Sequence, residues 1–77
     1  MIIAEHSVIV LTRDLPELGL QAGDVGAVVH IYADGQVYEI EFVTGSGRTL
    51  AVETLEAKDI RAPGDSEILH TRTVTAA

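Results

Sequence analysis

Residues 23–42 read GDVGAVVHIYADGQVYEIEF, and this stretch decides the fold. Its apolar residues flank an Asp-Gly pair, which is a strong signal for two antiparallel strands joined by a tight turn. A turn at Asp34-Gly35 pairs Ala33 with Gln36 and fixes the register of the hairpin. The pairs that follow are Ile31 with Tyr38, Val29 with Ile40, and Ala27 with Phe42.

This register predicts two different faces. The inner face holds only the apolar pairs given above. The outer face pairs Val28 with Glu41, His30 with Glu39, and Tyr32 with Val37. A slip of one residue would mix the two sets by pairing Ile31 with Glu39, so the register is strongly specified unless a bulge intervenes.

Three further short strands are expected outside the hairpin. Residues 7–11 form an apolar, β-branched run, which predicts the first strand. Residues 12–23 contain a proline and two glycines, which predicts a long structured loop. The leucines at 15, 18 and 20 of this loop are expected to cover the core. After a turn at residues 44–47, residues 48–53 predict a strand with Leu50 and Val52 inward and Thr49, Ala51 and Glu53 outward. A single 3₁₀ turn at residues 56–59 leads to a last short strand at Ile60.

The predicted fold class is therefore all-β. The pattern favours a small, strongly bent SH3-like antiparallel barrel of about five short strands with a long loop after the first, and an OB-like barrel is the alternative. Residues 1–63 are expected to form this barrel. Residues 64–77 form a C-terminal tail that either stays mobile or adds a strand to an edge.

Two resemblances rest on short motifs. The structural motif at Gly23, Asp24 and Gly26 resembles that of KOW domains, the SH3-like modules of ribosomal and transcription-elongation proteins, in which a glycine allows close backbone approach. A wider match, over residues 7–61, resembles a family of short bacterial proteins known only as a domain of unknown function. Its motifs here are residues 14–17, 19–20, 23–29, 38–42, 54–55 and 60–61. The resemblance implies an SH3-like fold and brings no catalytic residue.

Composition limits the partners. The 77 residues suit one domain. Twelve acidic against five basic residues give a formal net charge of −7. The basic residues are scattered singly along the chain. Binding of nucleic acid is not expected, because a protein that neutralises phosphates needs a stripe of Lys and Arg. The chain has no cysteine, no basic leader and no run of 18 apolar residues, so we expect a cytoplasmic protein that does not span a membrane.

Catalysis, metal binding and cofactor binding are not expected. No motif of a hydrolytic triad surrounds any of the three serines or three histidines. A metal site at His30 and Glu39, completed by Glu41 or His6, is weighed against an ordinary surface pair, and the pair is favoured because the spacing is nonspecific. The Gly-Ser-Gly of residues 45–47 lacks the lysine and helix of a phosphate loop.

The favoured hypothesis is a non-catalytic protein-interaction module. It would bind a basic partner protein, or self-associate, through an acidic face or an exposed strand edge, as an accessory or antitoxin-like subunit. Two tyrosines and no tryptophan argue against recognition of Pro-rich peptides. The alternatives are a nucleic-acid-associated KOW-like module and an accessory subunit of a larger enzyme complex. The candidate partner-binding residues are Val28, His30, Tyr32, Glu39, Glu41 and Glu53.

Overall fold

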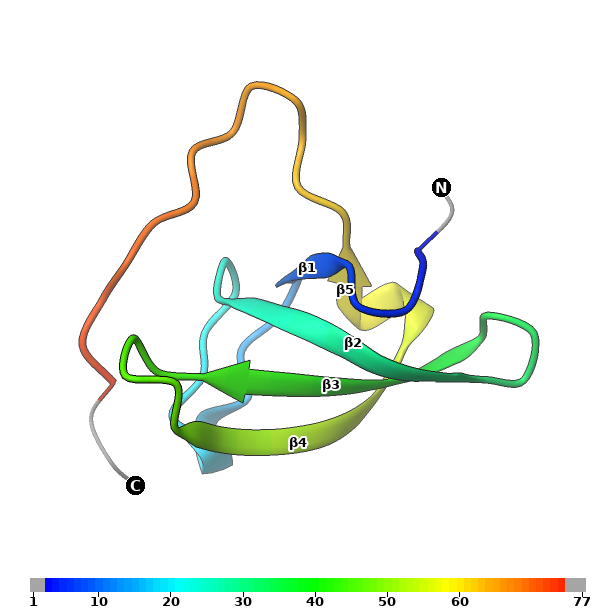
Figure 1. The fold of residues 1–77 in the computed structure, drawn as a ribbon, viewed down its shortest axis with the longest axis horizontal. Coiled ribbons are helices and arrows are strands. Elements are labelled where there is room, and N and C mark those ends of the chain that lie inside the picture. Colours follow the sequence, from blue (N-terminus) through cyan, green and yellow to red (C-terminus); the bar gives the residue numbers. More distant parts are fainter. Residues whose placement is uncertain (1–2, 75–77) are drawn as a thin grey trace.

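The computed structural model describes residues 3–74 and contains one antiparallel sheet (Figure 1). The sheet has five strands in the order β4-β3-β2-β1-β5. The strands are β1 (Val8–Leu11), β2 (Val25–Tyr32), β3 (Val37–Val43), β4 (Thr49–Glu56) and β5 (Ile60–Arg61). Two 3₁₀ turns, η1 (Pro16–Leu18) and η2 (Ala57–Asp59), lie in the connections.

The all-β class, the five antiparallel strands and the long loop after the first strand are confirmed. The sheet bends into a barrel-like shape but does not close, because β4 and β5 are its two edges and do not pair with each other (Figure 1). β5 pairs with β1 through only two residue pairs, Val10 with Arg61 and Leu11 with Ile60. The SH3-like relationship and the domain boundary at residue 63 stay predictions.

The core lies on the inner face of the sheet. Ile9, Val28 and Ile40 are completely buried there, and Leu15 and Leu20 of the long loop pack against them, as predicted, with Leu18 partly buried. Leu15 and Leu20 also form a backbone bridge, which closes the loop around η1. The core is therefore made almost entirely of aliphatic side chains, with Tyr38 and Phe42 as its aromatic members.

A β-bulge in β2 corrects the predicted hairpin register. Near the turn the pairs are as predicted, with Tyr32 opposite Val37 and His30 opposite Glu39. Between Val28 and His30 the register shifts, so Val28 pairs with Ile40 rather than with Glu41. As a result Val28 is 0% exposed and belongs to the core, whereas Val29 is 39% exposed. The prediction that Val28 faces outward and Val29 inward is wrong, because the extra residue of a bulge reverses the alternation beyond it.

The hairpin turn is a wider loop than predicted. The ladder ends at the pair Tyr32 and Val37, which leaves Ala33 to Gln36 in the turn. Ala33, Asp34 and Gly35 all have positive φ, at 50°, 56° and 87°. Asp and Gly tolerate this left-handed backbone, which explains why this dipeptide marks the turn.

The face assignments in β4 also need correction. The regular part of the β3–β4 ladder pairs Val52 with Glu41 and Glu53 with Ile40, and a second register shift, between Phe42 and Val43, takes Leu50 out of this alternation. Directly opposed residues share a face, so Val52 points outward and Glu53 lies on the inner side. Val52 is accordingly 52% exposed, although it was expected inside. Leu50 is partly buried against the core, as predicted.

A buried carboxylate joins the long loop to η2. Asp59 is 5% exposed, and its carboxylate accepts hydrogen bonds from Arg13 Nε at 2.8 Å and from the backbone N–H of Glu56 at 3.0 Å. Burial raises the pKa of Asp59, but the bonds from Arg13 and Glu56 and the charges of Arg13 and Lys58 outweigh it, so the pKa lies below its usual value. This ion pair has a structural role that the sequence pattern did not predict.

The tail folds back onto its own chain. Residues 62–74 form neither helix nor strand, and residues 75–77 of the predicted tail lie outside the described part. Near its start Glu67 accepts two hydrogen bonds from Arg61, at 2.6 and 2.9 Å, and one from the backbone N–H of Gly64. These bonds lower the pKa of Glu67 to about 2. Further along, Arg72 reaches Asp24 beside the start of β2.

Candidate partner-binding surface

The outer face of the sheet combines exposed apolar side chains with carboxylates. We define the outer face by Val8, Val29, His30, Tyr32, Glu39, Glu41, Val52 and Thr54. One continuous row crosses four strands, because Val8 pairs with Ala27, Ala27 with Glu41, and Glu41 with Val52. Val8, Val29, Tyr32 and Val52 are between 39% and 52% exposed. Four half-exposed apolar side chains on one face make this face the candidate binding surface.

Side-chain hydrogen bonds hold the carboxylates of the outer face in place. Glu39 accepts a hydrogen bond from Thr54 Oγ1 at 2.5 Å and another from the Tyr32 hydroxyl at 3.3 Å. Glu41 accepts one from Thr49 Oγ1 at 2.6 Å. The charge of Glu39, desolvation and the hydrogen bond to Glu39 raise the pKa of Tyr32, because each disfavours the phenolate. Glu39 thus connects β2, β3 and β4 on this surface.

His30 lies beside these groups without completing a metal site. Its ring meets Tyr32 edge-on, with the ring centroids 4.4 Å apart. Its Nδ1 lies 3.5 Å from Oε2 of Glu5. Within residues 3–74 no three histidine or acidic side chains are gathered closely enough to hold a metal ion.

The structure brings together four of the six predicted site residues. His30, Tyr32, Glu39 and Glu41 share the outer face, whereas Val28 is in the core and Glu53 lies on the inner side of β4. The prediction missed Val8, Val29, Val52 and Thr54. The exposure of Val29 and Val52 depends on register shifts, which leave no clear signal when the neighbouring residues are also apolar.

The predicted structural motif residues have separate roles. Gly26 allows close packing of two core side chains, because a Cβ there would lie 2.6 Å from Cγ2 of Ile40 and 2.9 Å from Cε1 of Phe42. Gly23 has a φ of 95°, which favours glycine. Asp24 accepts a hydrogen bond from the backbone N–H of Gln21 at 2.8 Å. Asp34 and Gly35 form the hairpin turn.

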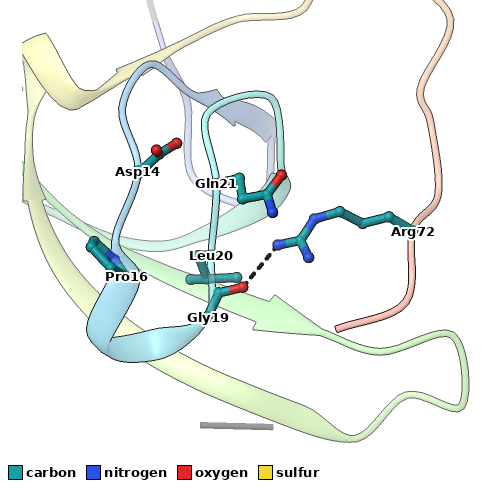
Figure 2. A pocket seen from close by; sticks show the side chains of 6 residues that line it. All are labelled: Asp14, Pro16, Gly19, Leu20, Gln21 and Arg72. Carbon is teal, nitrogen blue, oxygen red and sulfur yellow. Dashed lines mark hydrogen bonds between the residues drawn. The ribbon is translucent and has the colours of Figure 1, made fainter. Parts of the chain in front are cut away.

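A second surface lies where the tail meets the long loop. A pocket of about 320 Å³ lies there. Figure 2 shows the residues that line it, Asp14, Pro16, Gly19, Leu20, Gln21 and Arg72. Next to it, a cavity of about 630 Å³ lies between the tail and the barrel. Its apolar lining includes Leu20, Val25, Phe42 and Leu50.

The chain belongs to the family described as Domain of unknown function (DUF4926), whose model matches residues 5–62. This confirms the predicted membership of a domain-of-unknown-function family, which was based on residues 7–61. No curated protein and no solved structure matches the chain. Across residues 3–74, the structure contains no helix long and apolar enough to cross a membrane.

Proposed function

We propose that the protein is a non-catalytic protein-interaction module that binds a basic partner protein through its outer face. The observation that supports this most is the position of Val29, Tyr32 and Val52 beside Glu39 and Glu41 on one side of the sheet. Docking on this face would remove the exposed valines and the tyrosine from water, which stabilises a complex in proportion to the apolar area buried. The carboxylates would select a partner of positive charge.

The overall charge supports the same class of partner. A net charge of −7 speeds encounter with a positively charged surface and opposes encounter with nucleic acid. Three of the five basic residues are already paired with carboxylates: Arg13 with Asp59, Arg61 with Glu67, and Arg72 with Asp24. The nucleic-acid alternative is therefore disfavoured, because little free positive charge is left to neutralise phosphates.

The proposed biological role is that of an accessory or antitoxin-like subunit in the cytoplasm. The absence of cysteine fits a reducing compartment. Self-association through the outer face is less favourable, because two copies would bring Glu39 and Glu41 close to the same carboxylates of the second copy.

Affinity capture with charge variants tests this proposal. The wild-type chain and the double variant Glu39→Gln/Glu41→Gln are used to capture proteins from the native host. Glutamine keeps the shape of each side chain and removes two charges from the outer face. The matched control is Glu17→Gln/Asp65→Asn, which removes two charges from exposed positions outside the outer face. Thermal melting of all three proteins verifies that they fold.

We expect a specific protein to be retained by the wild type and by the control, and to be lost or reduced at least about fivefold with Glu39→Gln/Glu41→Gln. Retention should also fall between about 0.05 M and about 0.5 M salt, because screening weakens attraction between exposed charges. Equal loss with both double variants would contradict the role of the outer face, since it would show only an effect of net charge.

A further inference from the structure

The tail places an arginine in a site built by the long loop. Arg72 donates from Nε to Oδ1 of Asp24 at 2.8 Å and from Nη2 to Oδ2 of the same carboxylate. The same Nη2 donates to the backbone carbonyl of Gly19 at 2.9 Å (Figure 2). The guanidinium is therefore bound in the two-pronged geometry that distinguishes arginine from lysine.

Local structure positions the acceptors of this site. Asp24 Oδ2 also accepts the backbone N–H of Gln21, and the backbone N–H of Asp24 donates to the carbonyl of Gln21 at 3.0 Å. Gly19 ends η1 with a φ of 71°, in the left-handed region that favours glycine. The pKa of Asp24 is lowered, first by the hydrogen bond from Arg72 and then by the bond from Gln21 and the charge of Arg72. Burial acts in the opposite direction but is outweighed. Asp24 is thus a fixed, charged acceptor.

The tail does not fill the space beneath it. The cavity of about 630 Å³ lies between tail residues 70–74 and the barrel, where the apolar side chains of Val25 and Leu50 are only partly buried. In Figure 1 the tail arcs away from the sheet and returns only near the β3–β4 turn. A different extended segment could therefore keep the arginine contact and also bury apolar surface that the tail leaves open.

We propose that Asp24 and the Gly19 carbonyl form an arginine-recognition site. In the free protein Arg72 of the tail occupies this site. In the complex an arginine-bearing extended segment of a basic partner displaces the tail and takes its place. This inference rests on the proposed function for the class of partner, and it adds a second surface to the outer face. The tail then acts as an internal competitor. The apparent affinity for the partner segment is then the intrinsic affinity multiplied by the fraction of molecules in which the site is open.

Removing the internal arginine tests the proposal on the full chain. The probe is a fluorescent, end-capped peptide with the sequence of residues 68–74, and its binding is followed by fluorescence anisotropy. Arg72→Ala should bind this peptide about tenfold or more tightly than the wild type, because a short flexible connection gives the tail a local concentration on the order of millimolar. Arg48→Ala is the matched control, since it removes the same charge from a residue that lines the same cavity. It should bind the peptide like the wild type.

Two further measurements decide the specificity. A peptide with lysine in place of its arginine should bind Arg72→Ala at least about tenfold more weakly, because lysine lacks the two-pronged contact. Equal affinity of Arg72→Ala and the wild type, or equal affinity of the two peptides, would overturn the proposal. Sedimentation gives a further test. If the wild type is a dimer and Arg72→Ala is a monomer, the site takes the tail of a second copy, and this result would also overturn the proposal. These outcomes leave the outer-face proposal intact, because no residue of the outer face is altered.

Discussion

Val28→Ala should lower the free energy of unfolding by about 2 kcal/mol, whereas Val29→Ala should change it by less than about 0.5 kcal/mol. The two residues are adjacent and identical in type, so the comparison is internally matched. Val28 is completely buried opposite Ile40, and truncation there loses two buried methyl groups and leaves a cavity. Val29 lies in the bulge and is 39% exposed, so its truncation leaves no cavity.

Urea denaturation of both variants measures the difference. In a regular hairpin without the bulge, Val29 would face Ile40 and Val28 would face Glu41. A larger loss for Val29→Ala than for Val28→Ala would therefore contradict the bulge and the outer face built on it. Similar slopes of unfolding free energy against urea would verify that both variants unfold from a comparable native state.

Gly26→Ala should lower the free energy of unfolding by about 1–3 kcal/mol, because the core has no room for a Cβ at this position. The added carbon would lie 2.6 Å from Cγ2 of the completely buried Ile40. Neither Ile40 nor Phe42 can retreat without disturbing other core contacts. A loss of this size corresponds to a fall in melting temperature of about 4–8 °C for each kcal/mol in a domain of this length.

Gly45→Ala is the matched control for this substitution. A Cβ at Gly45 meets no atom within 4 Å, and Gly45 is not among the glycines with positive φ. We expect its melting temperature to stay close to that of the wild type or to rise slightly, since alanine restricts the unfolded chain. If Gly26→Ala melts together with Gly45→Ala, the close packing of β3 against Gly26 is wrong.

The hairpin could be predicted from sequence because its information is local. The Asp-Gly pair specifies a turn with positive φ, and the residues next to it alternate regularly, so the pairs from Tyr32 opposite Val37 to His30 opposite Glu39 follow directly. Beyond Val29 the register depends on which of two adjacent valines packs better in the core. That choice is made by tertiary packing against Ile40, which alternation of residue type does not encode.

The same distinction applies to the candidate site. Polar residues near the turn, namely His30, Tyr32 and Glu39, were assigned to the outer face correctly. In β4 regular alternation from Leu50 predicts that Val52 points inward, but the second register shift breaks this alternation and Val52 points outward. The ion pair of Arg72 and Asp24 joins residues 48 positions apart, and no local pattern predicts such a contact.

Binding of the captured partner to the outer face is tested most directly by NMR. The isotopically labelled full-length chain is titrated with the captured protein, and changes in the backbone amide signals are mapped onto the structure. We predict large changes on β2, β3 and β4 around Val29, Glu39, Glu41 and Val52, whether or not the tail also moves. Unchanged signals at these positions, at a partner concentration that saturates binding, would contradict the proposed function.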